Sequence, residues 1–241
     1  CVPRSDARAL EPRRKMHILA NKGGTQYMTL LRRQAIMLVL AGGLVALAIT
    51  PSTARTDGPE ATVEAFHSDL LSVMKDSVNL GISGRYNKFL GHLDRYFHMP
   101  LMVSFVSGEH WAKAGQEARR DLNNAARRIG AGELAVLFSG YGGETFKTTG
   151  TRTIKDGSVL VETELERQSD SSVKLTYRLR KFDEKWRIID VLLDGTISQL
   201  LKRRDEYRRT LENSGVAGLI ALLNAKADEI LASDRTAKAA K

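Results

Sequence analysis

Cysteine is nearly absent from this chain of 241 residues, in which the only example is Cys1. Without cysteine pairs, no disulfide framework can hold the fold together, so its stability has to come from a hydrophobic core. Beyond the first residue, the same absence excludes a cysteine nucleophile and a zinc site built from thiolates.

Long hydrophobic runs are also scarce, and the chain contains one, from Ala35 to Ile49. This run is about fifteen residues long, whereas a bilayer-spanning helix needs roughly 20 apolar residues. The basic pair Arg32-Arg33 precedes it, and the small residues Ser52-Thr53-Ala54 follow it. This order predicts a secretory signal peptide over residues 28–54, cleaved after Ala54. A membrane anchor is the alternative, and the short run and the cleavage motif argue against it.

The predicted cleavage divides the chain into three parts. Residues 1–27 lie upstream of a workable start and are interpreted as an extension that is not part of the mature protein. Residues 55–241 remain as a single domain of 187 residues, which is long enough to bury a core without disulfides. We expect the tail from about residue 233 to be disordered.

The charge of the chain belongs mostly to the part that is predicted to be removed. The whole sequence has a net charge of +9, which by itself would favour a nucleic-acid partner. Residues 1–54 hold eight of the 37 Lys and Arg and two of the 28 Asp and Glu, so the remaining domain has a net charge of +3. A balance that mild does not indicate nucleic-acid binding.

Catalytic motifs are missing as well. Four histidines lie in the predicted domain, and they lack the close spacing of a metal motif: His67, His92, His98 and His110. No serine stands in a nucleophile-elbow pattern, and there is no phosphate-binding loop. We therefore expect no metal and no cofactor, and we predict histidines that are exposed or hydrogen-bonded within the fold.

What the domain does contain is an ordered series of periodic patterns. Apolar residues at helical spacing predict a helix that begins at Pro59, a helix that ends at Phe97, a short helix over 101–106 and a long helix over 116–138. From residue 144 to 194 the period changes to two, and three tight turns separate four strands, which predicts antiparallel hairpins. Helices over 197–211 and 216–231 follow. This order is typical of an α+β fold.

The segment from Trp186 to Ser198 has a strand that is apolar on both faces except for Asp190. Such a strand has to be covered on both sides, so we expect the sheet to lie between two layers. A buried carboxylate needs a partner, for which Arg178, Arg187 and Tyr177 are the candidates. The structural interpretation is an ion pair that holds the sheet to a helix. The functional interpretation makes Asp190 a general base or an anchor for a lipid headgroup.

Several short motifs then follow one another in a recognisable order. They are Gly108-x-x-Trp111, Gly140-Tyr-Gly-Gly-Glu144, Tyr177-Arg-Leu-Arg180, Trp186-Arg-Ile-Ile-Asp-Val191, Gly195-Thr-Ile-Ser198, a basic helix with Tyr207, and Gly215-Val-Ala-Gly-Leu-Ile220. In this order they resemble the MlaC/toluene-tolerance family of periplasmic lipid-binding proteins. The segments 57–63 and 194–198 are similar to the branch of that family associated with hopanoid biosynthesis.

The resemblance implies a four-stranded antiparallel meander, covered by N-terminal and C-terminal helices, that encloses an apolar cavity for lipid tails. It implies a periplasmic monomer that carries phospholipid or a hopanoid-type lipid between an inner-membrane lipid transporter complex and an outer-membrane lipoprotein complex. The expected lipid-binding residues are Met102, Val106, Trp111, Phe138, Tyr141, Leu175, Tyr177 and Val191. For any one of these residues considered alone, a place in the hydrophobic core is the simpler interpretation than a place in the wall of a lipid cavity.

Two other functions stay open from the residues alone. A small α+β enzyme could use Asp190, Tyr177 and His98 as an acid–base set and would need a polar pocket. A ligand-free envelope scaffold would have a filled core. The basic run Lys202-Arg203-Arg204 is interpreted as a solvated helix face, or else as a docking site for an acidic partner or anionic headgroups.

Overall fold

The computed structural model describes residues 58–168 and 170–239. The predicted signal peptide over 28–54 and the upstream extension 1–27 lie outside these residues, as do the last two residues of the predicted tail. Within the described ranges, no helix combines the length and the hydrophobicity needed to cross a bilayer.

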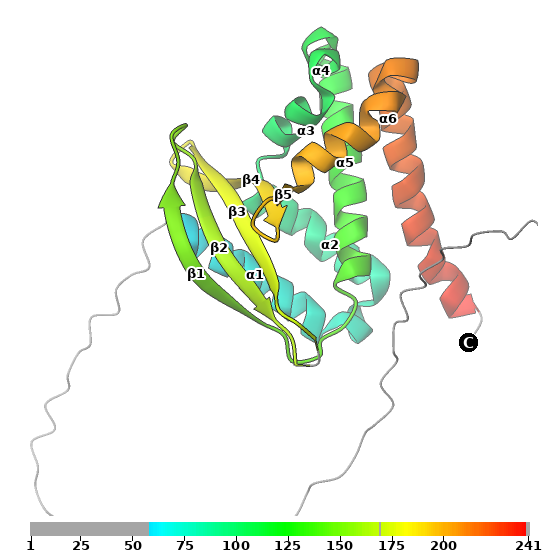
Figure 1. Cartoon of the computed structure of the whole chain (residues 1–241). Helices are drawn as coiled ribbons and strands as arrows, with labels where there is room; N and C mark the ends of the chain where they lie inside the picture. Colours follow the sequence, from blue (N-terminus) through cyan, green and yellow to red (C-terminus); the bar gives the residue numbers. More distant parts are fainter. Residues whose placement is uncertain (1–57, 169, 240–241) are drawn as a thin grey trace, which may run out of the picture. The chain divides into compact units, whose positions relative to one another are not determined.

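Helices open and close the described part of the chain, and the strands lie between them in the sequence. In space, the sheet forms one side of the unit and the helices the other (Figure 1). The helices are α1 (Pro59–Lys75), α2 (Ser77–Tyr96), α3 (Met99–Ser107), α4 (Glu109–Lys113), α5 (Gln116–Leu137) and α6 (Gln199–Ala239). The predicted helix starts at Pro59 and at residue 116 are confirmed. Proline at the first helical position suits a helix start, because its missing N–H would have no partner there.

The strands form one antiparallel sheet in the order β1-β2-β3-β4-β5. They are β1 (Thr145–Thr153), β2 (Val159–Glu166), β3 (Val173–Phe182), β4 (Lys185–Leu193) and β5 (Ile197–Ser198). The α+β class and the antiparallel hairpins are confirmed, and β5 adds a short fifth strand to the predicted four. Ile197 pairs with Leu193 on β4, so the last helix begins at Gln199 rather than at Ile197.

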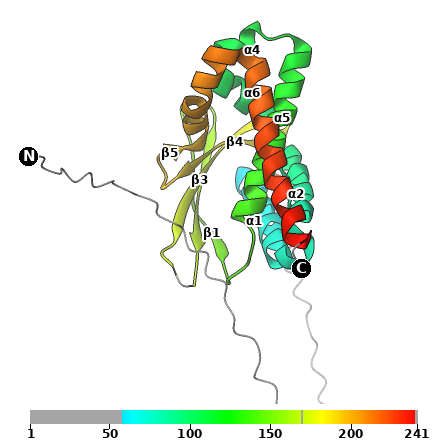
Figure 2. The same ribbon diagram turned by 90° about the vertical axis from the view of Figure 1, so that its right-hand side faces the viewer.

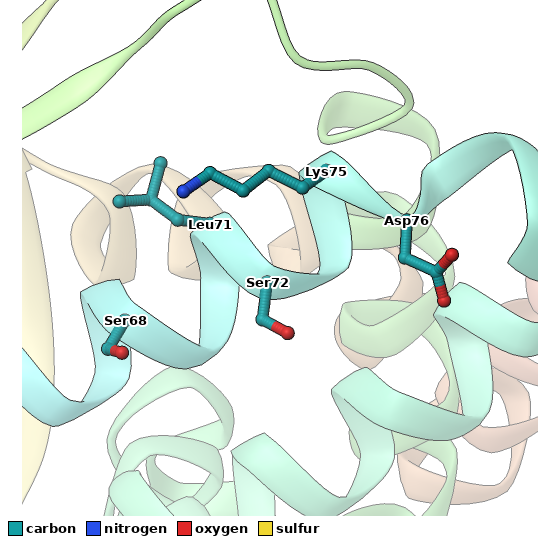
Figure 3. A pocket seen from close by; sticks show the side chains of 5 residues that line it. All are labelled: Ser68, Leu71, Ser72, Lys75 and Asp76. Atoms are coloured by element: carbon teal, nitrogen blue, oxygen red, sulfur yellow. The ribbon is translucent and has the colours of Figure 1, made fainter. Parts of the chain in front are cut away.

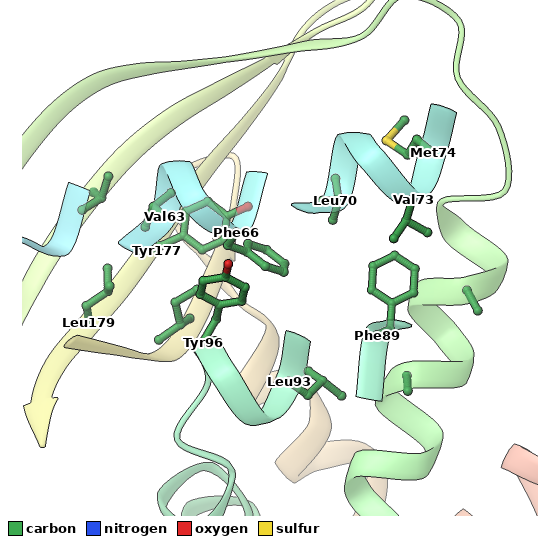
Figure 4. Close-up of a cluster of buried hydrophobic side chains, with 14 of the residues drawn as sticks. Val63, Phe66, Leu70, Val73, Met74, Phe89, Leu93, Tyr96, Tyr177 and Leu179 are labelled. Carbon is green, nitrogen blue, oxygen red and sulfur yellow. The ribbon is translucent and has the colours of Figure 1, made fainter. Parts of the chain in front are cut away.

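One face of the sheet is apolar and packs against α1 and α2. Its side chains alternate along the strands and include Phe146, Val159, Val161, Leu175, Tyr177, Leu179, Ile188 and Val191. We call this face with its helical partners the sheet cluster. It also contains Phe66, Leu70, Phe89 and Tyr96 from α1 and α2. Figure 4 shows Phe66 and Tyr96 beside Tyr177, and Phe89 against Val73 of α1.

The opposite face of the sheet is largely polar, so the expectation of two covering layers is wrong for β1 to β3. Arg178 and Arg180 alternate with the apolar residues of β3, and both bind Asp156 in the turn before β2. A β-bulge explains the misleading apolar run in β4. Arg178 pairs with Asp190 and Leu179 with Ile188, which leaves Ile189 as an extra residue in the strand.

A second apolar cluster lies among helices alone. We call it the helix cluster, and its buried members are Val103 and Val106 of α3, Leu122, Ala125 and Ile129 of α5, and Tyr207, Leu211, Leu219, Leu223 and Ala227 of α6. Met99 and Ile230 pack against both clusters and join them. The chain reverses within α6 at Gly215, where φ is 61°, and Figures 1 and 2 show the two halves of the helix folded back. The predicted break at Gly215 is confirmed.

Candidate functional site

The seam between α1 and the apolar face of the sheet is the candidate functional site. At its centre, His67 of α1 shares a hydrogen bond of 2.9 Å with the Tyr177 hydroxyl, and its ring stacks on Phe146 with 3.9 Å between the centroids. Phe66 meets Tyr177 and Phe97 edge-on. The seam therefore brings a helix and two strands together through aromatic rings that carry few polar atoms.

Burial keeps both polar groups of this centre neutral. The pKa of His67 is lowered to about 3, because the surrounding apolar side chains disfavour the charged ring. The pKa of the Tyr177 hydroxyl is raised by the same burial. The neutral imidazole and the neutral phenol are each other's hydrogen-bond partners, so the centre of the seam carries no charge. Such an interior suits apolar groups better than acid–base catalysis.

The structure divides the eight predicted lipid-binding residues between several places. Four belong to the sheet cluster or pack against it: Phe138, Leu175, Tyr177 and Val191. Val106 is buried in the helix cluster, and Trp111 packs on its edge. Met102 lies half-buried on α3, and Tyr141 is exposed, with the Lys75 ammonium 5.1 Å from the centre of its ring. The set does not surround one space.

Two hollows lie beside the seam, along α1. The larger has a volume of about 620 Å³ and is lined by Ser68, Leu71, Ser72, Lys75 and Asp76 (Figure 3). The smaller, of about 140 Å³, shares Ser72 and Asp76 with it and adds Asp69, Val73, Leu80, Lys88 and His92. Their linings mix charged and apolar residues and are not the enclosed apolar cavity expected from the sequence. The apolar side chains of the sheet cluster are buried against one another, as the hydrophobic effect favours.

A polar group at the smaller hollow was not found by sequence reasoning. Asp69 of α1 accepts a hydrogen bond of 2.6 Å from the Tyr96 hydroxyl, and His92 and Arg95 of α2 lie 3.8 and 3.7 Å from the same carboxylate. Burial and the neighbouring carboxylate raise the pKa of Tyr96 to about 12. Burial also lowers the pKa of His92. The sequence did contain a sign of this group: His92 and Tyr96 are four residues apart, so in a helix they lie on the same face.

Asp190 joins the sheet to α6, as the structural interpretation proposed, but through other partners. Its carboxylate accepts hydrogen bonds from the Ser198 hydroxyl at 2.5 Å and from the Leu200 amide at 3.1 Å. The Leu200 amide belongs to the first turn of α6, where backbone N–H groups lack helical partners. The expected ion pair with Arg178 or Arg187 is therefore wrong: Asp190 caps the helix, and Arg178 binds Asp156.

The acid–base set of the enzyme hypothesis does not come together. Tyr177 points to the apolar face of the sheet, whereas Asp190 stands opposite Arg178 and faces the other side. His98 stacks on Phe182 and accepts a hydrogen bond from the Leu101 amide at the start of α3. Since the sheet separates the two oxygens, Asp190 and Tyr177 cannot act on the same substrate atom.

The basic run at the start of α6 is partly engaged within the fold. Arg203 binds Glu133 of α5 and Glu206 one turn further along α6. The guanidinium of Arg204 lies over the ring of Phe105 on α3. Lys202 is exposed. The interpretation as a helix face with local ion pairs fits Arg203, while Lys202 and Arg204 are exposed.

Comparisons with known proteins agree with this architecture. Residues 64–225 match the family described as MlaC protein. Among solved structures, the chain shares its fold with a phospholipid-binding protein from Ralstonia solanacearum in complex with a phospholipid. The TM-score is 0.62 at 18% identity, over 72% of this chain and 98% of that chain. No curated protein sequence matches the chain.

Proposed function

Because the chain belongs to the MlaC family, we propose that it is a lipid-binding carrier and not a catalyst. It takes up a membrane lipid in the periplasm, after export and cleavage following Ala54, and carries it between the inner and outer membranes. The family match over residues 64–225 is the observation that carries this proposal. The likeness of the fold to a phospholipid-binding protein that holds its ligand supports it.

The seam between α1 and the sheet is where we place the lipid tails. Its side chains are apolar or aromatic, and its two polar groups are neutral and satisfied by each other. Tails would replace contacts between Phe146, Leu175 and Val191 and the helices as the two layers separate. Such an exchange loses little free energy, because each apolar side chain keeps an apolar neighbour.

Uptake from a membrane also changes the free energy of the lipid tails only slightly. Each buried CH₂ group gains about 0.8 kcal/mol relative to water, but the methylenes of a membrane lipid are already buried before transfer. The direction of transfer is therefore decided by the donor and acceptor. We propose an inner-membrane lipid transporter complex and an outer-membrane lipoprotein complex in these roles, with the carrier acting as a monomer.

The chemical class of the lipid is a membrane phospholipid or a hopanoid-type lipid. The similarity of residues 57–63 and 194–198 to the hopanoid-associated branch favours the second. Organic-solvent extraction of the natively purified protein, followed by mass spectrometry, should release one lipid class in a near-stoichiometric amount. Protein that is reproducibly free of lipid, and that takes up none from vesicles, would exclude a carrier and leave the ligand-free scaffold as the function.

Two neighbouring residues of β4 offer a matched test of where the tails lie. Val191 faces the sheet cluster, and Leu192 is its half-buried neighbour on the opposite face. A tryptophan at position 191 would occupy space in the seam, so Val191→Trp should lower uptake of a fluorescent phospholipid several-fold. Leu192→Trp adds the same ring outside the seam and should load as the unmodified protein does. Equal loading by the two variants would place the lipid elsewhere.

A further inference from the structure

Four of the most exposed large apolar side chains gather at one end of the described unit. They are Val78 (91% exposed), Val136 (52%), Leu137 (68%) and Tyr141 (42%). They come from the turn at the start of α2, the end of α5 and the loop before β1, three segments that Figure 1 draws at the same end. We call these four residues together with Lys75 the apolar tip.

Two contacts hold the tip together. The guanidinium of Arg85 donates to the carbonyls of Ser77 and Ala135, each at 2.8 Å, and so places the residues that follow them, Val78 and Val136, near each other. On the other side, the Lys75 ammonium lies 5.1 Å from the centre of the Tyr141 ring. The buried arginine bridge shows that the fold keeps these exposed side chains in one place.

The composition of the tip points to its partner. Val78 lies in the first turn of α2 and Leu137 at the end of α5, so both offer single side chains for insertion and not a groove for a peptide. Tyrosine and lysine next to aliphatic side chains are typical of the interface between lipid tails and headgroups, since both have an apolar body and a polar end. The charges of Lys75 and its neighbour Asp76 offset each other, so the attraction has to be mainly apolar.

The tip also adjoins the seam. Phe138, the residue after Leu137, packs against the sheet cluster, and Leu71 and Lys75 line the larger hollow on α1. A bilayer at the tip would therefore lie next to one end of the seam that we assign to the lipid tails.

We propose that the apolar tip docks on the surface of a lipid bilayer by inserting Val78, Val136, Leu137 and Tyr141 among the headgroups. The docking itself requires no transported lipid. Its role in lipid exchange rests on the proposed carrier function.

The test compares two double variants of equal chemistry in the purified protein. Val78→Asp/Leu137→Asp removes the tip, whereas Ile197→Asp/Leu201→Asp changes two apolar residues, each 53% exposed, at β5 and the start of α6. Co-sedimentation with phosphatidylcholine vesicles should fall by roughly tenfold for the tip variant. It should stay within about twofold for the control variant. Raising the salt concentration should leave the binding of the unmodified protein nearly unchanged, because the contact is apolar.

Several results would overturn the docking proposal. These are tip-variant binding at the level of the unmodified protein, an equal loss in the control variant, and binding that disappears with salt. A dimer that the tip substitutions convert to monomers, with no vesicle binding, would assign the tip to a second copy of the chain. If the aspartate variant does not fold, Val78→Ser/Leu137→Ser makes the same test without new charges.

Lipid extraction separates this proposal from the carrier function. Protein that binds vesicles through the tip but never contains lipid would refute the carrier and keep the docking site. If the tip variant contains lipid and transfers it between vesicles as well as the unmodified protein does, the carrier function stands and a role of the docking site in lipid exchange is refuted.

Discussion

The sheet cluster and the helix cluster bury apolar surface with different kinds of side chains. The helix cluster consists mainly of aliphatic side chains and alanines on helices that approach closely. On the same face of α5, a Cβ added at Gly132 would lie 3.2 Å from Ile230 of α6. The sheet cluster uses aromatic rings and contains a buried histidine whose partner is 110 positions away.

The difference assigns separate roles to the two regions. Closely packed helices have little room to adjust, because small residues leave backbones near each other and any shift opens voids. A helix that lies on a sheet is held by side chains, and large rings can find new neighbours when the layers separate. We therefore interpret the helix cluster as the support and the sheet cluster as the part that accommodates ligand.

The largest expected effects come from removing one leucine from each cluster. Leu223→Ala in the helix cluster and Leu179→Ala in the sheet cluster truncate side chains that are essentially inaccessible to solvent. Each should lower the free energy of unfolding by about 2–5 kcal/mol, measured by denaturant titration. Only Leu179→Ala should change the amount or kind of lipid bound per folded protein. If Leu223→Ala changes bound lipid as strongly, the division of roles is wrong.

Asp190 connects the sheet to the helix that carries much of the second cluster. Asp190→Asn keeps the shape of the side chain but weakens its hydrogen bonds to Ser198 and to the Leu200 amide. We expect a loss of about 1–3 kcal/mol in the free energy of unfolding and unchanged lipid binding per folded molecule. Ser198→Ala should reproduce part of the loss. Reduced lipid binding by an equally stable Asp190→Asn protein would restore the functional interpretation of this acid.

His67 should make the stability of the sheet cluster depend on pH. Its pKa is about 3 in the folded protein against an ordinary value of 6.5, so between these values the unfolded chain binds a proton that the folded protein does not. Stability is therefore full above pH 6.5 and is lost as the pH falls, by up to about 1.4 kcal/mol per pH unit. His67→Gln should flatten this slope in denaturant titrations at pH 6, 5 and 4.

His110→Gln is the matched control for that experiment, because His110 lies on α4, away from the sheet cluster. It should leave the slope as it is in the unmodified protein. An identical slope in the His67→Gln protein would show that other groups cause the pH dependence.

The smallest effect is expected at the hairpin between β3 and β4, outside both clusters. Glu184 sits in the turn with a φ of 60°, a conformation that glycine adopts without strain. Glu184→Gly should raise the free energy of unfolding by about 0.5–1 kcal/mol. Lipid binding should not change, because the turn is remote from the seam. A change in lipid binding here would mean that sheet stability, and not seam packing, controls uptake.

Much of the fold followed from local patterns. The stripe that ends at Phe97, the period of two after Glu144 and the glycine at position 215 predicted helices, hairpins and a helix break that the structure contains. The seam was only half predictable. Tyr177 and Leu175 were among the expected lipid-binding residues, and the structure places both in the sheet cluster. The histidine that contacts Tyr177 was expected only to be exposed or hydrogen-bonded somewhere in the fold. Nothing local marks a pair that is 110 positions apart.

The sequence by itself determined which side of most helices and strands is buried, because the spacing of apolar residues along the chain gives the buried face. Only the tertiary structure decided which buried sides meet. In the folded protein, one of the two consecutive isoleucines of β4 forms a β-bulge, and Asp190 accepts a hydrogen bond from the first turn of α6. Arg85 binds the carbonyls that precede Val78 and Val136 and so holds these two residues at one end. These outcomes depend on where distant backbone groups lie once the layers have packed, and a local pattern carries no such information.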